Sequence, residues 1–553
     1  MNWFAAAWRD AARHERAAFS FVLAASFVSL LFSIAGYPAV GHDADVHLNW
    51  LDQFSRLRAQ GIAYPRWLPI SNGGFGSPTF YFYPPLPYWI ASFLRLFLPY
   101  VPTPFYNVMA LIATMGSLVT SAALARRYAN RPLIIATVAL TYSFLAYHFA
   151  DVFVRDALGE HWAMMFLPQV FIRLHGRLQT IALLSIAWSG LVLTNIPITV
   201  LAGASVLVAL IVERRKASVI EHGVALLIAA AVSAAYLLPA AFLRPLIHPE
   251  HLWDVKMQTT GFAVLDLFRF HGWLRFLALA TLVAGALYLL LAWRDRLRQG
   301  AWWWIALIAV VVQIPIFTPL WHLHAASIVQ FSWRWNSVLL LALAMAFAVR
   351  ASIVLSWLLV GLAIVTVIGE ARLATTFIVH PLLPYDRYRI DAPEYHPVWC
   401  SNDPGEIKAI AMFRIGDPPA MLLGLTPTED SIVRIAQDAD AMTFHVHLTQ
   451  PAPARFHLFY WPYWKLTIWD SVAGRGPNVA SLQPDPNGIA TASLPAGDYR
   501  LDLSLVESEP EVVGKYISLI GLMGLIGMIG FAAYRERTIC LDTIEVPIVS
   551  RAT

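Results

Sequence analysis

The chain has 553 residues, of which 58% are hydrophobic and only 13% charged, and its mean hydropathy is +0.58. Because soluble domains carry about 25% charged residues, this composition excludes an ordinary soluble protein and indicates that lipid is the main solvent. The net charge of +4 is small, and no polar stretch interleaves basic with aromatic residues, so nucleic acid is not an expected partner. The two cysteines, Cys400 and Cys540, fall on opposite sides of the membrane in the topology below, so no disulfide is expected.

Twelve apolar segments approach or reach the roughly 20 residues that a helix needs to cross a bilayer. In chain order they are 17–37, 104–125, 132–150, 159–173, 178–195, 197–212, 219–243, 273–293, 301–318, 336–349, 351–369 and 514–534. The first follows several arginines but precedes no signal-peptidase site, so a retained helix is predicted. Segments 159–173, 197–212 and 336–349 are short for a crossing.

The placement of Lys and Arg sets the orientation of these segments. With twelve crossings and a cytoplasmic N-terminus, every basic cluster between segments lies in the cytoplasm, as the positive-inside rule requires. The clusters are 126–131, 173–177, 214–216, 294–298, Arg350 and 535–537. The sequence therefore predicts a multi-pass membrane protein with both termini in the cytoplasm and a cytoplasmic tail at 535–553.

Two long regions are then expected outside the cytoplasm. The first is the loop 38–104, in which the apolar stretch 88–98 is too short to cross and predicts a helix at the membrane interface. The second, 372–512, predicts an extracytoplasmic β-sandwich-like domain, and a final crossing follows at 513–534. Strands are expected at 442–448, 456–469 and 499–505. Turns are expected at 485–488 and 495–497.

The first loop opens with an acidic pair, Asp43-x-Asp45, which is a candidate catalytic site. Two carboxylates this close can chelate Mg²⁺ or Mn²⁺, or one can act as a general base while the other orients it. The alternative interpretation is a helix N-terminus, where acidic side chains cap amides and suit the dipole. The spacing alone leaves both interpretations open, and the neighbouring His47 is a candidate substrate contact.

The rest of this loop is rich in Gly, Pro and aromatic residues, and it includes Arg66 and the aromatic run 80–89 with Tyr83. Such a loop can clasp the face of a sugar, so Arg66 and Tyr83 are candidate substrate-binding residues. The alternative is a packed turn in the aromatic belt at the membrane surface.

Further charged candidates lie at the outer ends of predicted crossings. Asp156 and Glu160 share one face if their segment is helical, and Glu160 begins an apolar helix, where an acid is costly without a role. The alternative for Asp156, and also for Asp151, is an acidic residue that only keeps the loop solvated. Arg155 is a candidate because it is one of few basic residues in the short outer loops. Arg334, among aromatics, can bind a lipid phosphate or extend to headgroups without a specific partner.

Together these segments resemble a family of bacterial membrane proteins labelled 6-pyruvoyl-tetrahydropterin synthase-related, which is similar to a branch of the GT-C glycosyltransferases. The matching residues are Asp43 and Asp45, the run 76–89, the segment 154–160, Gln330-Phe-Ser-Trp-Arg334 and Glu394-Tyr-His-Pro397. The family usually has Pro where Ser332 stands. The three-His zinc site of a pterin synthase is not found in the sequence, so that activity is not expected.

The resemblance implies a GT-C-like membrane domain over 1–371 that transfers a sugar, with inversion, from a polyprenyl-phosphate carrier to a glycan, lipid or protein acceptor. The reaction would take place at the outer face of the bacterial cytoplasmic (inner) membrane. It implies Asp43 or Asp45 as base or metal ligand and Glu160 or Asp156 as a second acid. Arg155 and Arg334 are implied as ligands of the carrier phosphate, whose developing charge must be neutralised.

Two other classes of function stay open. A transporter or flippase of a lipid-linked substrate also has about twelve crossings, although the predicted helices hold few ionisable residues at mid-membrane depth. A catalytically inactive GT-C-like scaffold that binds glycan or protein is the third interpretation.

Overall fold

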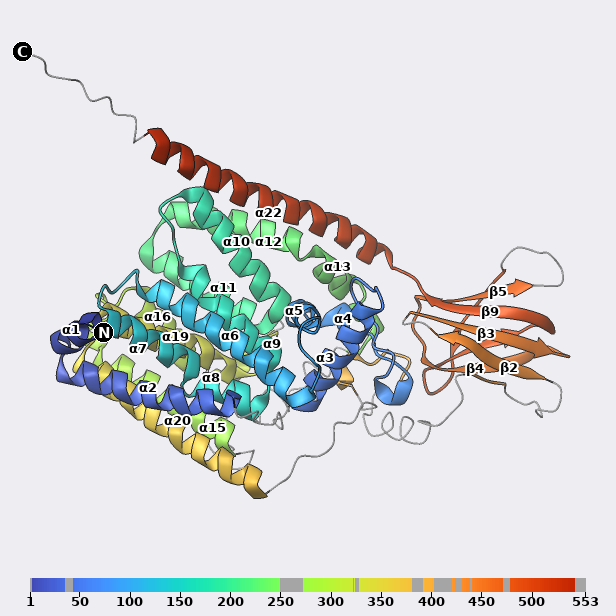
Figure 1. The fold of residues 1–553 in the computed structure, drawn as a ribbon, viewed down its shortest axis with the longest axis horizontal. Coiled ribbons are helices and arrows are strands. Elements are labelled where there is room, and N and C mark those ends of the chain that lie inside the picture. The colour runs from blue at the N-terminus through green and yellow to red at the C-terminus, as the bar shows by residue number, and fades with distance from the viewer. Residues whose placement is uncertain are drawn as a thin grey trace, which may run out of the picture.

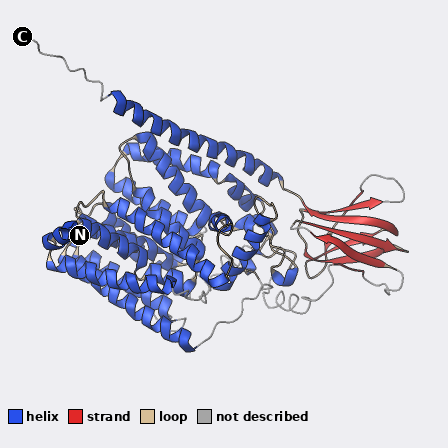
Figure 2. Cartoon of the chain, in the orientation of Figure 1, coloured by secondary structure: helices blue, strands red, loops and turns tan. Residues whose placement is uncertain are grey.

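The computed structural model describes residues 2–34, 43–248, 272–321, 323, 328–379, 391–401, 420–422, 430–437, 440–470 and 478–542. A helical bundle makes up most of this part of the chain, and β sheets stand at one end of it (Figures 1 and 2). The first helix, α1 (Asn2–Asp10), and the C-terminal part of α22 (Glu509–Asp542) lie at the other end. We call these two ends of the bundle the sheet end and the terminal end.

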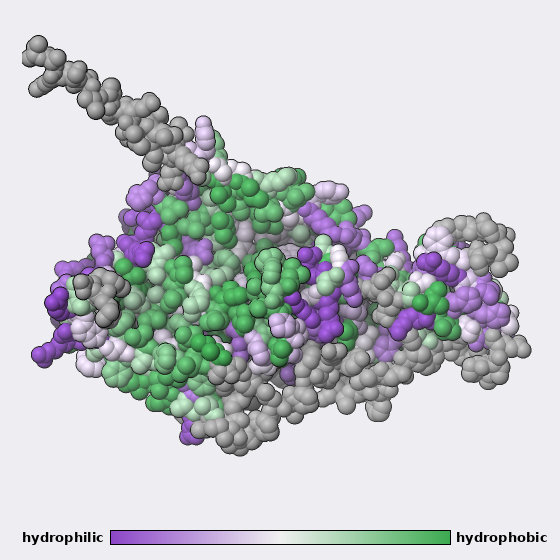
Figure 3. Space-filling model, viewed as in Figure 1, coloured by the Kyte–Doolittle hydropathy of each residue, from purple (hydrophilic) through white to green (hydrophobic). Residues whose placement is uncertain are grey.

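Eight helical segments among the described residues are long and apolar enough to cross a bilayer, so the chain is a multi-pass membrane protein. They are α2 (Arg13–Ile34), α6 (Pro102–Ala125), the segment of α7 (Pro132–Phe144), α8 (Tyr147–Ala150) and η2 (Asp151–Arg155), α10 (Arg177–Thr194), α11 (Ile196–Glu213), η9 (Ser332–Arg334) with α19 (Trp335–Val349), α20 (Ile353–Val379) and α22. Apolar side chains cover the bundle in the face shown by Figure 3, between hydrophilic zones near the two ends.

The other four predicted crossings are also helical, but they are shorter or bent. They are α9 (Leu158–Phe166) with η3 (Leu167–Phe171), α12 (Lys216–Val232) with α13 (Ala234–Phe242), α15 (Gly272–Leu291) and α16 (Ala301–Val311). Pro168 stands where α9 gives way to η3, and Pro315 begins a separate 3₁₀ turn after α16, since proline lacks the amide that a continuing helix needs. The axes of α12 and α13 meet at 75°.

Helix α22 packs against α12 and α13 through two close approaches. A Cβ added at Gly514 would lie 2.6 Å from the carbonyl oxygen of Ala234, and one at Gly521 would lie 2.8 Å from the carbonyl carbon of Ala231. Small residues of this kind let membrane helices bring their backbones together. The start of α22 is therefore fixed beside α13, at the sheet end.

The β region is confirmed as two antiparallel sheets. One has the order β1-β4-β8-β7 and the other β2-β3-β9-β5-β6. The strands are β1 (Ala420–Leu422), β2 (Ser431–Gln437), β3 (Ala441–Leu448), β4 (Ala452–Phe459), β5 (Trp464–Asp470), β6 (Asn478–Ala480), β7 (Gln483–Pro484), β8 (Ile489–Leu494) and β9 (Gly497–Leu505). Phe444 of β3 and Phe456 of β4 meet edge to face with ring centroids 5.7 Å apart, which joins the two sheets in one core.

Two details of the β region differ from the prediction. The expected strand 456–469 is divided between β4 and β5 by a turn at Pro462, because proline cannot donate to a ladder. Helix α20 runs on to Val379, beyond the expected boundary at 371, and the described strands begin at Ala420. The turn expected at 485–488 is present, and Gly488 takes a φ of 75° there.

The described part of the first loop, residues 43–101, packs against the sheets, and we call it the loop module. It contains α3 (Ala44–Ala59), η1 (Asn72–Gly74), α4 (Thr79–Phe82) and α5 (Leu86–Leu94). Phe75 stacks on His457 with ring centroids 4.0 Å apart, and its carbonyl accepts a 2.8 Å hydrogen bond from the amide of Phe459. The expected short helix within 88–98 is α5, which is followed by the exposed side chains of Leu96 and Phe97.

Candidate functional site

A buried ion-pair network lies at the sheet end of the bundle, where α9, η2 and η9 meet. The carboxylate of Glu160 accepts hydrogen bonds from Arg155 at 2.6 Å, from Arg334 at 2.9 Å and from the hydroxyl of Tyr147 at 2.7 Å. Arg155 also pairs with Asp151 at 2.6 Å. Asp151 and Glu160 are 0% and 1% exposed, and Arg155 and Arg334 are 5% and 7% exposed. Two arginines and two carboxylates thus share one water-poor site.

Unusual backbone conformations at both ends of one short segment place these side chains. Ala146 and Asp156 have φ angles of 45° and 55°, so each interrupts the regular helical backbone with a local turn, one before α8 and one after η2. Between the two turns, Asp151 and Arg155 are four residues apart and form an ion pair on the same face. Because the left-handed turn at Asp156 separates η2 from α9, the shared helical face expected for Asp156 and Glu160 does not form.

Arg334 does not extend to the headgroups, which was one of its two sequence interpretations. Its guanidinium pairs with Glu160 through Nε, and its Nη1 donates to the carbonyl of Val329 at 2.9 Å and to Gln330 at 2.6 Å. Gln330 has a φ of 63°, so the loop before η9 turns back around the guanidinium. Arg334 is therefore held in one orientation beside Glu160.

The start of α3 connects the acidic loop to this network. The amide of Asp43 donates a 2.8 Å hydrogen bond to the carbonyl of Arg155, which fixes the N-terminus of α3 next to the network. Asp43 is the N-cap residue of α3 and is half-buried, but its side chain makes no capping hydrogen bond to the described amides of that helix. The position expected by the alternative interpretation is therefore confirmed, because Asp43 is the N-cap residue of α3 and Asp45 lies in its first turn, although no capping hydrogen bond from Asp43 is described.

Tyr83, which follows α4, lies where the loop module meets the network. A Cβ added at Gly159 would lie 2.7 Å from the Tyr83 hydroxyl oxygen, so this hydroxyl touches the backbone beside Glu160. Burial raises the pKa of Tyr83, and the negative charge of Asp43 raises it further, against the positive charge of Arg334. The Tyr83 hydroxyl thus lies against the backbone of the helix that carries Glu160.

His47 lies one turn into α3 from Asp43 and is buried among aromatic rings. Its Nδ1 shares a 2.6 Å hydrogen bond with the Tyr88 hydroxyl, and its ring meets Tyr83 at 5.9 Å between centroids. Burial lowers the pKa of His47 from 6.5 to about 4, although the nearby charge of Asp43 opposes the shift. His47 is therefore neutral at pH 7 and suits a hydrogen-bonding role.

A segment that precedes the sheets closes the site from another side. The buried Asp391 accepts hydrogen bonds from the Trp50 indole at 2.8 Å and from Thr79 at 2.5 Å. The next acid, Glu394, is half-buried, and burial raises its pKa from 4.5 to about 7, with smaller contributions from the negative charges of Asp391 and Asp43. Tyr395 meets Trp50 with ring centroids 6.0 Å apart.

Two predicted site residues are placed differently from this group. Asp45 lies exposed on the first turn of α3. Arg66 is buried and pairs with Glu511 at 2.8 Å, and it donates to the carbonyl of Ala235 at 2.8 Å, so it joins the loop module to α13 and α22. Its described ion pair gives Arg66 a structural role.

The carboxylates predicted to bind Mg²⁺ or Mn²⁺ do not form a matched pair of ligands. Asp43 is half-buried and Asp45 exposed, and side chains two residues apart at the start of a helix do not face each other. Within the described ranges, no group of three or more His, Cys, Asp or Glu side chains is placed to hold a metal ion. Metal binding stays a prediction.

Sequence reasoning missed three members of the site. Asp151 was interpreted as a residue that solvates the loop, but it is fully buried, and its four-residue spacing from Arg155 was the available signal. Tyr147 carries no sequence signal, because only the turn at Ala146 brings it to Glu160. Glu394 belongs to a segment that carries the resemblance but was given no role, and only the fold brings its neighbour Tyr395 to Trp50 of α3.

Comparisons with known proteins do not identify the chain. No protein-family model matches it, and neither does any curated protein.

Proposed function

We propose that this protein is an integral membrane glycosyltransferase of the GT-C type that transfers a sugar from a polyprenyl-phosphate-linked donor to a glycan, lipid or protein acceptor. The observation that carries the proposal is the buried pairing of Glu160 with Arg155 and Arg334, next to the half-buried Asp43, whose amide donates to the carbonyl of Arg155. A carboxylate and two arginines at the membrane surface are the groups that this chemistry requires. The resemblance described above names the same residues.

In the proposed reaction, Asp43 is the general base. An acceptor hydroxyl is a poor nucleophile at pH 7, so a positioned carboxylate must take its proton as the new C–O bond forms. The bond between the sugar carbon and the phosphate oxygen breaks on the opposite side, which inverts the configuration. Polyprenyl phosphate leaves as an anion, and the proton stays on Asp43 until it returns to water.

Arg334 and Arg155 would bind the phosphate as its negative charge develops. Arginine carries five N–H donors in a planar fork, and the described bonds of Arg334 use Nε and Nη1, so Nη2 would meet the phosphate. Glu160 accepts from both guanidinium groups and is almost fully buried, so we assign it a positioning role and not proton transfer. Such fixed charges stabilise an anionic transition state without reorganising during the reaction.

The proposed topology has twelve crossings, with the termini in the cytoplasm and the loop module and sheets outside the bacterial cytoplasmic membrane. It is supported by the positions of the basic clusters and by the location of α1 and the C-terminal part of α22 at the end opposite the sheets (Figure 1). Because nucleotide sugars are confined to the cytoplasm, a lipid-borne donor suits a site on this side.

The test compares two neighbouring aspartates. We expect Asp43→Asn to lower transfer of labelled sugar from a polyprenyl-phosphate donor in membrane vesicles by about 10²–10⁴-fold, the usual contribution of a general base. Asp45→Asn is the matched control, because it makes the same chemical change at an exposed carboxylate two residues away. This variant should keep the activity. Equal transfer by both variants and the unmodified chain would contradict the assignment of Asp43.

One observation favours the transporter alternative. The span of α12 and α13 is bent by 75°, and interrupted helices often line transport sites. Vesicles that move a labelled lipid-linked sugar across the bilayer without forming a glycosidic product would support that class. Movement that survives Asp43→Asn together with absent transfer would decide for the transporter.

A further inference from the structure

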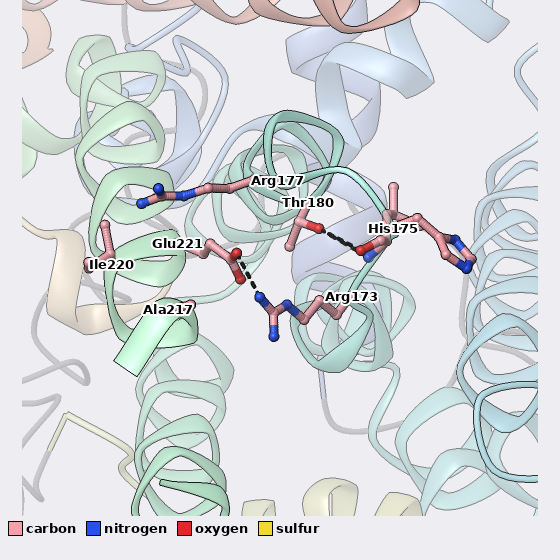
Figure 4. Close-up of a pocket in the computed structure, with 8 residues that line it drawn as sticks. Arg173, His175, Arg177, Thr180, Ala217, Ile220 and Glu221 are labelled. Carbon is pink, nitrogen blue, oxygen red and sulfur yellow. Dashed lines mark hydrogen bonds and ion pairs between the residues drawn. The ribbon is translucent and has the colours of Figure 1, made fainter. Parts of the chain in front are cut away.

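We infer that a second site, at the terminal end of the bundle, binds a phosphate group. A cavity of about 200 Å³ lies between the first turns of α10 and α12 and the loop that precedes α10 (Figure 4). Its lining includes Arg173, Arg177, Thr180, Ile220 and Glu221. At about 30 Å³ per liquid water, this volume exceeds what one water fills.

The cavity lies far from the site described above. Helix α12 leads from the cavity to Val232 and then into α13, which contacts α4 of the loop module. The beginning of α12 is consequently at the opposite end of the bundle. In the proposed topology this is the cytoplasmic face, so the second site is independent of the sugar-transfer site.

The charges of the lining leave a net positive cavity. Arg173 pairs with the buried Glu221 at 3.0 Å, which neutralises the only acid in the lining. Arg177 extends across the cavity from α10 towards α12, whereas the ring of His175 points away from this pair (Figure 4). One arginine thus faces the cavity beyond the internal ion pair.

Two helix N-termini add to this positive potential. Helix α10 begins after Gly176 and α12 begins after Arg215. Glycine has no side chain and arginine has no acceptor, so neither residue can cap the first amides of its helix. The positive ends of both helix dipoles therefore add to the charge of Arg177. A phosphate group has the charge and the acceptor oxygens to use them together with Arg177.

The surface next to the cavity favours a lipid as the source of the phosphate. Ile220 lines the cavity and is 53% exposed, and Val224 and Leu227 on the same face of α12 are 37% and 74% exposed. This apolar stripe leads from the charged mouth along the membrane-facing side of the helix. A ligand with a phosphate head and acyl chains fits both parts, and basic pockets between membrane helices are known to hold such headgroups.

Native mass spectrometry of the purified full chain in detergent tests the inference, with phosphatidylglycerol and phosphatidylcholine as the added lipids. We expect preferential retention of phosphatidylglycerol, and about fivefold weaker binding by Arg177→Gln, which corresponds to about 1 kcal/mol per basic residue at a membrane surface. Arg127→Gln is the matched control, because it removes an exposed arginine at another cytoplasmic cluster and should leave binding unchanged.

A melting measurement separates the binding effect from misfolding. Because Arg177 is exposed, Arg177→Gln should keep the melting temperature of the unmodified chain in detergent while its lipid binding weakens. Wild-type affinity in Arg177→Gln would overturn the inference. Inorganic phosphate forms a third arm: if it binds in an Arg177-dependent way and the lipid does not, the phosphate site stands and its source is a free phosphate.

Discussion

Replacing Glu160 by Gln should destabilise the protein strongly, because it removes one charge from a buried network and keeps the shape. The carboxylate accepts from Arg155 at 2.6 Å and from Arg334 at 2.9 Å, and it is 1% exposed. In the variant, both arginines stay buried and only Asp151 remains as their described ion partner. Removing one partner of a buried ion pair costs about 3–5 kcal/mol.

That cost is large beside the total stability of a folded domain, which is about 5–15 kcal/mol. The melting temperature of the purified chain in detergent, followed by tryptophan fluorescence, should therefore fall by several degrees. Glu213→Gln is the matched control: Glu213 pairs with Arg215 at 3.5 Å, but both side chains are about half exposed, so little change is expected.

A double-mutant cycle identifies the cause of the loss. If the destabilisation comes from the unpaired arginines, adding Arg334→Gln to Glu160→Gln should cost less than the two single changes together, with a coupling of about 0.5–3 kcal/mol. Additive losses, or a Glu160→Gln variant that melts together with Glu213→Gln, would refute the idea that the buried charges depend on one another.

Two further predictions concern packing and pH. Gly159→Ala should destabilise the chain by about 1–3 kcal/mol in thermal melting, since its Cβ would lie 2.7 Å from the Tyr83 hydroxyl oxygen. Gly203→Ala is the control: its Cβ would meet no atom within 4 Å, so this variant should melt at the same or a higher temperature. For Glu394, burial raises the pKa from 4.5 to about 7, so the folded state binds more protons than the unfolded one between these values and stability must fall as the pH rises through this window. Melting temperatures between pH 5 and 8 should show Glu394→Gln gaining on the unmodified chain as the pH rises, and parallel curves would contradict the assignment.

Much of the fold was predictable because membrane helices and sheets leave periodic signals. The apolar segments follow from the cost of exposing polar groups to lipid, and all twelve are helical in the structure, although eight of them meet the length for an independent crossing. Strand β3 and the turn at Gly488 followed from alternation and turn residues. The bend between α12 and α13 did not, because no proline marks the break at Ser233.

The sequence singled out several residues of the candidate site, but not their contacts with one another. Asp43 was selected for its pairing with Asp45, Glu160 because an acid is costly at the start of an apolar helix, and Arg334 because it stands among aromatic residues and can bind a lipid phosphate. The contacts of Arg155 and Glu160 depend on the positive-φ turns at Ala146 and Asp156, and an alanine gives no sequence signal for such a turn. Spacing therefore suggested a shared face for Asp156 and Glu160 that the turn prevents.

The β region is best understood as a structural part of the candidate site. Trp50 of α3 donates to Asp391, which precedes the sheets, and Phe75 of the loop module stacks on His457 of β4. Helix α3 is thus held between the bundle and the sheets, and Asp43 stands at its first turn, tied by its amide to Arg155. Because the position of this carboxylate depends on both contacts, disturbing the sheet interface should displace the proposed base even though no strand residue reaches it directly among the described contacts.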